Sequence, residues 1–176
     1  MNLPDRTLPG HWVREAITQY ENRLVRYAAR VTGDMETARD VVQETFARLC
    51  GQEPASLNGR LLPWLYTVCR NRAIECRRKD RRMQAIGDIA FDTMTDGRDG
   101  PSETLERRET VGGMLAILAK LPESQQEVLR LKFQEGLSYK EISEVTGHSV
   151  SNVGVLLHTA IKKLRERMSV APASCR

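Results

Sequence analysis

Long apolar runs and paired cysteines are both missing from this 176-residue sequence. No stretch comes near the ~18 apolar residues that a membrane-spanning helix needs, and residues 1–10 lack the apolar core of a signal peptide. The four cysteines, at positions 50, 69, 76 and 175, form no C-x-x-C pair, which argues against a zinc ribbon or a disulfide scaffold. Cys69 and Cys76, seven residues apart on one predicted helix, are more typical of core packing than of a metal site. We therefore expect a reduced, cytoplasmic protein without a bound metal.

Motifs for catalysis are equally scarce. The three histidines, at positions 11, 148 and 158, are scattered, and the sequence holds no Gly-rich phosphate loop or nucleophile motif. No segment alternates polar and apolar residues with the period of two that marks a strand. We therefore expect an all-α protein that is not an enzyme and uses no cofactor. The net charge is only +4, so a nucleic-acid partner must be argued from where the charges lie.

Apolar residues do recur at helical spacing in the first half of the chain. Within positions 12–31 the apolar residues form one stripe of a predicted amphipathic helix. A second helix is predicted after Gly33, with Asp34 as its N-cap. A loop over 51–63 is predicted from its Gly, Pro, Ser and Asn content, and a third helix over 64–83. These helices make up a predicted first domain, residues 1–85.

The composition then changes twice. Acidic residues and few apolar ones predict a flexible acidic linker over residues 86–113. Short helices follow over 114–121 and 123–135, and two more after Ser138. We therefore predict two small helical domains, the second over 114–170, with a tail over 171–176.

A helix-turn-helix is predicted at the end of the second domain. Ser138 and Glu141 have the spacing of a capping box, Gly147 ends that helix, and Ser149 caps the next. A helix-turn-helix presents its second helix to the major groove of DNA, although the same spacing also fits an ordinary helical hairpin. The candidate DNA contacts are Lys140, Ser149, Ser151, Asn152, Val155, His158, Thr159, Lys162 and Lys163.

The predicted third helix is strongly basic. Six arginines and Lys79 face only Glu75 and Asp80 between positions 64 and 83, a local charge of +5. Such a helix neutralises phosphates, and Trp64 and Tyr66 at its start can stack on unpaired bases. A solvated basic surface with Trp64 in the core is the alternative.

Acidic and amide side chains share one face of the predicted second helix, opposite an apolar stripe. They are Asp34, Glu36, Asp40, Gln43 and Glu44. This face complements a basic helical surface on a partner, although a solvated face explains the same pattern.

Three motifs, taken in order, resemble one family. They are Asp34 to Phe46 (DMETARDVVQETF), Trp64-Leu65 ahead of Arg70-Asn71-Arg72-Ala73, and Leu121-Pro122 with Gln126 before the helix-turn-helix. Over residues 17–83 and 114–168 the chain resembles the extracytoplasmic-function (group IV) sigma-70-type sigma factors of bacterial RNA polymerase. The resemblance implies a first domain that docks on the β′ clamp helices of core polymerase and melts the minus-10 element. It also implies a second domain that binds the minus-35 element and the β flap, and restraint by an anti-sigma factor.

The resemblance also assigns site residues. Asp40, Gln43 and Glu44 match polymerase-binding positions. The minus-10 contacts it implies, together with two neighbouring arginines of the basic helix, are Leu57, Asn58, Arg60, Trp64, Tyr66, Arg70, Asn71, Arg72, Arg77 and Arg78. The recognition helix departs from the family, because Gly154, Leu156 and Thr159 stand at positions that are usually basic. A helix-turn-helix regulator that binds duplex DNA without recruiting polymerase is the alternative function.

Overall fold

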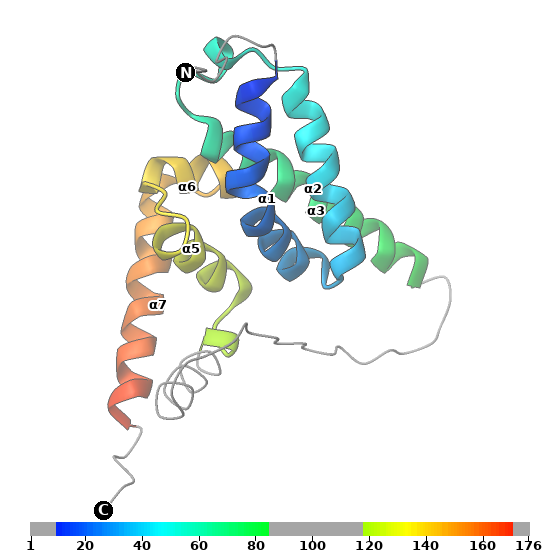
Figure 1. The fold of residues 1–176 in the computed structure, drawn as a ribbon. Coiled ribbons are helices and arrows are strands. Elements are labelled where there is room, and N and C mark those ends of the chain that lie inside the picture. The colour runs from blue at the N-terminus through cyan, green and yellow to red at the C-terminus, as the bar shows by residue number, and fades with distance from the viewer. Residues whose placement is uncertain (1–9, 85–117, 171–176) are drawn as a thin grey trace, which may run out of the picture. The chain divides into compact units, whose positions relative to one another are not determined.

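The computed structural model describes residues 10–84 and 118–170, which contain six α-helices and one 3-10 helix and no strand (Figure 1). The helices belong to two compact units, one holding α1 to α3 and the other α5 to α7. The all-α prediction is confirmed for these ranges, and within them no helix is long and apolar enough to cross a membrane. The predicted acidic linker, the tail and most of the helix over 114–121 lie outside the described residues.

The first unit begins with two helices joined by a tight turn. Helix α1 spans His11–Thr32 and α2 spans Met35–Cys50, close to the predicted bounds. Gly33 adopts φ +83°, which a residue without a Cβ tolerates, and its N–H donates to the Ala29 carbonyl at 2.8 Å. The Thr37 N–H then donates to Asp34 Oδ2 at 2.6 Å, so the predicted N-cap is confirmed.

This N-cap makes the stability of α2 depend on pH. The Thr37 hydrogen bond lowers the pKa of Asp34, so the stabilisation is present above the unfolded-state pKa of about 3.9 and is lost as the pH falls through the native pKa. We expect Asp34→Ala to lower the free energy of unfolding by about 1 kcal/mol at neutral pH, and by less in strong acid. Asp34→Asn, which keeps a cap without the charge, is the control. Urea unfolding at neutral pH and in strong acid measures the free energy of unfolding of each variant. A loss of stability for Asp34→Ala that is equal at the two pH values would contradict the predicted pH dependence.

The core of the first unit is closed by the third helix. A 3-10 helix, η1, spans Pro54–Leu57 inside the predicted loop, and α3 spans Leu61–Gln84. Helix α3 thus begins three residues before the predicted Trp64. The prediction was wrong because Pro63 was taken to precede the helix, whereas proline fits the first turn, where its missing N–H leaves no intrahelical bond unmade. The buried core residues include Leu24, Tyr27, Ala28, Val41, Val42, Phe46, Leu49, Leu65, Tyr66, Cys69 and Ala73.

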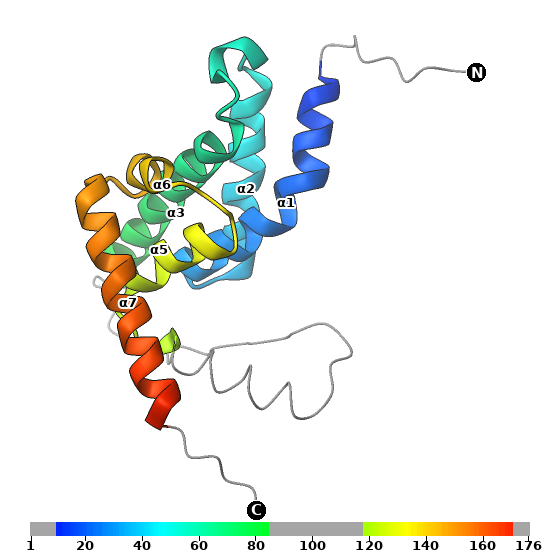
Figure 2. The same cartoon turned by 90° about the vertical axis from the view of Figure 1, so that its left-hand side faces the viewer.

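The second unit contains the predicted helix-turn-helix. Helix α5 spans Glu123–Phe133, α6 spans Tyr139–Thr146 and α7 spans Val150–Val170. Both bonds of the capping box are present: the Ser138 N–H donates to Glu141 Oε2 at 2.7 Å, and the Glu141 N–H to Ser138 Oγ at 3.3 Å. A short turn through Gly147, at φ +76°, leads from α6 to α7 (Figure 2). The predicted turn chemistry is therefore confirmed.

Candidate functional site

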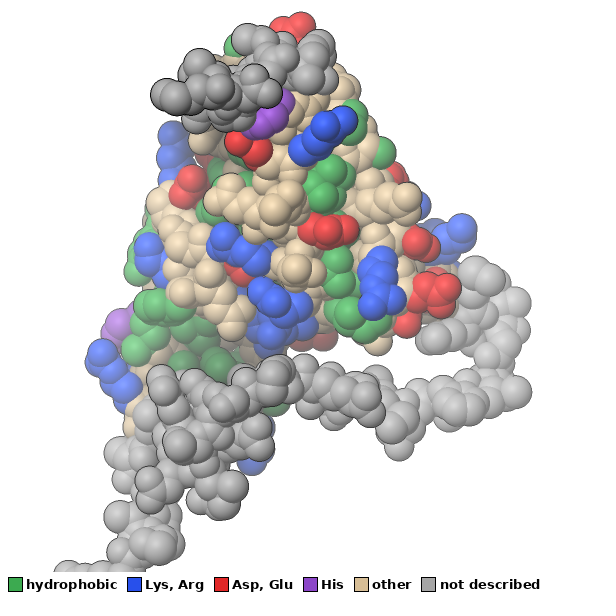
Figure 3. Space-filling view, viewed as in Figure 1, with side chains coloured by type: hydrophobic (Ala, Val, Ile, Leu, Met, Phe, Trp, Pro, Cys, Tyr) green, Lys and Arg blue, Asp and Glu red, His purple; other side chains and the backbone are tan. Residues whose placement is uncertain are grey.

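Two of the three residues predicted to contact polymerase have solvent-exposed side chains on α2. Asp40 and Gln43 are exposed, while Val41, Val42 and Phe46 on the other side of the helix are buried against α1 and α3. The core therefore fixes the rotation of α2 and holds Asp40 and Gln43 outward. On the face of the molecule that carries α1 and α2, acidic and basic side chains are interspersed (Figure 3).

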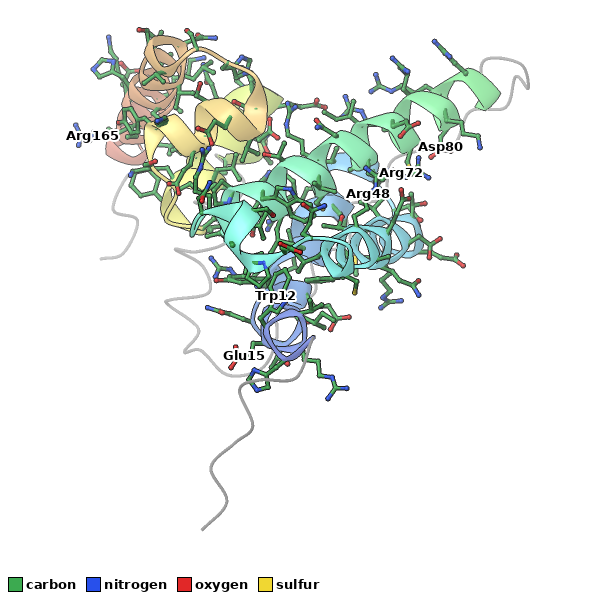
Figure 4. All side chains as sticks on the ribbon, turned by 90° about the horizontal axis from the view of Figure 1, so that it is seen from above. Trp12, Glu15, Arg48, Arg72, Asp80 and Arg165 are labelled. Atoms are coloured by element: carbon green, nitrogen blue, oxygen red, sulfur yellow. The ribbon has the colours of Figure 1, made fainter. Side chains whose placement is uncertain are left out.

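The third predicted contact, Glu44, is engaged by two arginines. Its Oε1 accepts from Arg48 Nη2 at 2.8 Å, and its Oε2 accepts from Arg72 Nε at 2.6 Å. Arg72 also donates from Nη1 to Glu75 Oε2 at 2.9 Å, and the Glu75 and Glu44 carboxylates raise the pKa of Arg72. Figure 4 shows Arg48 and Arg72 on neighbouring helices. Glu44 thus joins α2, which carries the predicted polymerase contacts, to α3, which carries the predicted minus-10 contacts.

The loop before α3 contains one buried leucine and two exposed polar residues that were predicted to contact DNA. Leu57 is only 8% exposed and its side chain belongs to the core of this unit, which argues against its prediction as a DNA contact. Asn58 and Arg60 are exposed on either side of Gly59, and the turn needs left-handed backbone, with φ +46° at Asn58 and +71° at Gly59. The structure therefore leaves Asn58 and Arg60 as the accessible candidates in this loop.

The aromatic residues at the start of α3 have different environments. Trp64 is half-buried, whereas Tyr66 is 0% exposed and its ring meets Tyr27 edge to face, with centroids 5.1 Å apart. The position of the ring inside the core argues against the prediction that Tyr66 stacks on a base. Helical spacing places Tyr66 on one stripe with Cys69 and Ala73, and this signal in the sequence would have identified it as buried.

Further along α3 the residues predicted to contact DNA differ in their solvent exposure. Asn71 and Arg78 are exposed, Arg70 and Arg77 are half-buried, and Arg72 is held by the carboxylates described above. Cys69 on the same helix is buried, and burial raises the pKa of its thiol to about 12, so that it stays protonated at neutral pH. Within the described ranges, His, Cys, Asp and Glu side chains gather nowhere in the groups of three that a metal site needs.

The first half of α7, the second helix of the helix-turn-helix, presents a mainly polar outer face with little charge. Ser151, Asn152, Val155 and His158 are exposed, and Thr159 is half-buried. Positions 150–160 contain no lysine or arginine. The predicted basic contacts lie outside this segment: Lys140 is exposed in the first turn of α6, Lys162 is exposed within 4.0 Å of Glu166, and Lys163 is half-buried.

Two side chains at the start of α7 already have local partners. The Ser149 hydroxyl accepts from the Asn152 N–H at 3.2 Å, which confirms the predicted cap. The Asn152 side-chain amide lies 3.4 Å from Nδ1 of His148. The structure thus orients Asn152 at the end of the helix that a helix-turn-helix inserts into the major groove.

Comparison with known proteins assigns both units to one family. The chain matches the model of Sigma-70 region 2 over residues 16–83 and that of Sigma-70, region 4 over residues 113–164. It is 31% identical to the RNA polymerase sigma factor YlaC of Bacillus subtilis, covering 89% of this chain and 92% of that protein. It is 33% identical to the ECF RNA polymerase sigma factor SigL of Mycobacterium tuberculosis, covering 81% and 80%.

A solved structure shares the fold. The sigma factor RpoE of Bartonella quintana, crystallised in complex with the anti-sigma factor NepR, matches with a TM-score of 0.70 at 21% identity, covering 90% of this chain and 98% of that one. Both sigma-70 regions are therefore present in order, on a fold seen in a sigma factor. The chain belongs to the extracytoplasmic-function group of sigma-70-type RNA polymerase sigma factors.

Proposed function

We propose that the exposed Asp40–Gln43 face of α2 binds the β′ clamp helices of core RNA polymerase, and that α3 and the loop before it bind and melt the minus-10 element. The second unit binds the minus-35 element through α7 and contacts the β flap. One observation carries the assignment of the first unit: the core holds Asp40 and Gln43 outward on α2, while the Glu44–Arg72 ion pair joins that helix to the basic α3. A polymerase contact and a DNA contact are thereby held in one unit.

The proposed domain limits follow from these roles. The first domain is residues 1–85, the linker 86–113, the second domain 114–170 and the tail 171–176; the regions matched by the two family models support the two domains. The chain acts by binding rather than by catalysis, and it acts in the cytoplasm, where core polymerase transcribes. An anti-sigma factor is a further proposed partner, supported by the complex in which the similar RpoE fold was solved.

Binding to core polymerase separates this function from its alternative. A sigma factor binds core polymerase tightly and duplex promoter DNA hardly at all when alone, whereas a helix-turn-helix regulator does the reverse. A pull-down of the full chain with purified core polymerase, beside a gel-shift with duplex DNA, makes the comparison. Tight DNA binding without polymerase binding would refute the proposal.

The recognition helix offers a test of minus-35 docking. A Cβ on Gly154 would lie 3.8 Å from Cε2 of Tyr139, an ordinary van der Waals contact, so the first atom of a new side chain meets no clash there. We expect Gly154→Lys to add about one phosphate contact and to steepen the salt dependence of holoenzyme binding by about one unit. Gly154→Gln is the matched control, since it also raises helix propensity but adds no charge. An unchanged slope for Gly154→Lys would mean that α7 docks in a different register from its relatives.

A further inference from the structure

The outward direction of α7 is fixed by its buried residues. Val153, Leu157 and Ala160 are buried against the rest of the second unit. At 100° per residue, Val155 points about 170° away from the mean direction of these three side chains. Val155 therefore stands at the middle of the exposed face of the recognition helix, and 62% of its surface is accessible.

The surroundings of Val155 on this face are polar. Ser151, His158 and Lys162 lie along the same ridge at steps of three and four residues, and all three are exposed. Val150, a second exposed valine near the start of α7, lies about 140° away from Val155 around the helix axis. A single aliphatic side chain thus stands within a polar ridge, whereas protein–protein contacts favour contiguous apolar patches.

In the major groove of DNA, an aliphatic side chain can make an apolar contact with one group on the base edges. Those edges present hydrogen-bond donors and acceptors, and the C5-methyl group of thymine is their apolar feature. A β-branched side chain in a helix has one strongly preferred χ1 rotamer, so Val155 loses little conformational freedom when it packs against that methyl group. With no lysine or arginine over positions 150–160, apolar and neutral polar contacts must supply base recognition in this segment.

We propose that Val155 is a specificity-determining residue that packs against the C5-methyl group of a thymine in the minus-35 element. The proposal rests on the proposed function, because it requires α7 to lie in the major groove of that element. Its consequence is that this unit selects thymine at one position of the minus-35 element by apolar contact.

Replacing thymine with uracil tests the contact, because the change removes only the methyl group. Holoenzyme made from the full chain and core polymerase first selects binders from a duplex promoter library randomised over the minus-35 region. Each thymine of a selected fragment is then replaced by uracil in turn. We expect the wild-type holoenzyme to lose about fourfold in affinity at one of these positions, the effect of losing one buried methyl group.

The variants decide whether Val155 makes the contact. Val155→Ala should bind the thymine fragment several-fold more weakly and be insensitive to uracil at that position, while Val150→Ala, the matched control, should behave as wild type. Selection without a preferred thymine, or an equal uracil effect in wild type and Val155→Ala, overturns the proposal. A wild-type chain that does not bind core polymerase would instead refute the proposed function itself.

Discussion

Replacing Asp40 with arginine is expected to weaken binding to core RNA polymerase by several kcal/mol, a loss of about a hundredfold or more. In the proposed interface Asp40 lies against a basic surface of the clamp, so the substitution turns an attraction into a like-charge contact. Asp40 is exposed on the side of α2 opposite the buried Val41 and Val42, and the helical fold should survive the change. Titration of labelled core polymerase with each variant measures the loss.

A charge reversal elsewhere on the same unit serves as the control. Glu21 is exposed on α1, and Glu21→Arg changes the net charge by the same amount as Asp40→Arg. We expect Glu21→Arg to bind core polymerase within a few-fold of wild type, because only the general attraction between the partners changes. A folded Asp40→Arg variant that binds as tightly as Glu21→Arg would remove α2 from the polymerase interface.

The second large effect is expected at Trp64 and concerns promoter melting. Its half-buried ring lies at the start of α3, with one part in the core and another accessible. Trp64→Ala should remove a stacking surface worth ~1–3 kcal/mol per base, so the holoenzyme should still form but open the minus-10 element poorly. Permanganate reactivity of the minus-10 thymines, which rises when they become unpaired, reports the opening.

Two conservative variants separate stacking from packing at Trp64. Trp64→Phe keeps an aromatic face and should retain much of the melting, whereas Trp64→Leu keeps apolar bulk without that face and should melt as poorly as Trp64→Ala. Circular dichroism checks that each variant is folded. Normal permanganate reactivity in a folded Trp64→Leu holoenzyme would contradict the stacking role.

The local features of this fold could be predicted because each depends on neighbouring residues. The N-cap at Asp34, the capping box of Ser138 and Glu141 and the turn at Gly147 are chemical patterns within a few residues, and the structure contains all of them. The exposure of Asp40 followed from the apolar stripe on the other side of α2. Helical periodicity and capping therefore explain most of the described elements.

Features that depend on contacts between helices were predicted less well. Tyr66 was assigned to DNA because aromatic residues beside arginines fit single-strand binding, but its place on the stripe with Cys69 puts it in the core. The ion pair between Glu44 and Arg72 joins residues 28 positions apart, and nothing in the local sequence marks it. Leu57 likewise is a core residue, although it lies in a segment whose composition predicts a surface loop.

Promoter-directed transcription by a reconstituted polymerase tests the central claim most directly. Purified core polymerase transcribes fragmented genomic DNA of the source cell with and without the full chain, and the transcript start sites are mapped. We expect a small set of start sites that requires the chain and disappears when Asp40→Arg replaces the wild type. The same start sites with and without the chain would contradict the central claim.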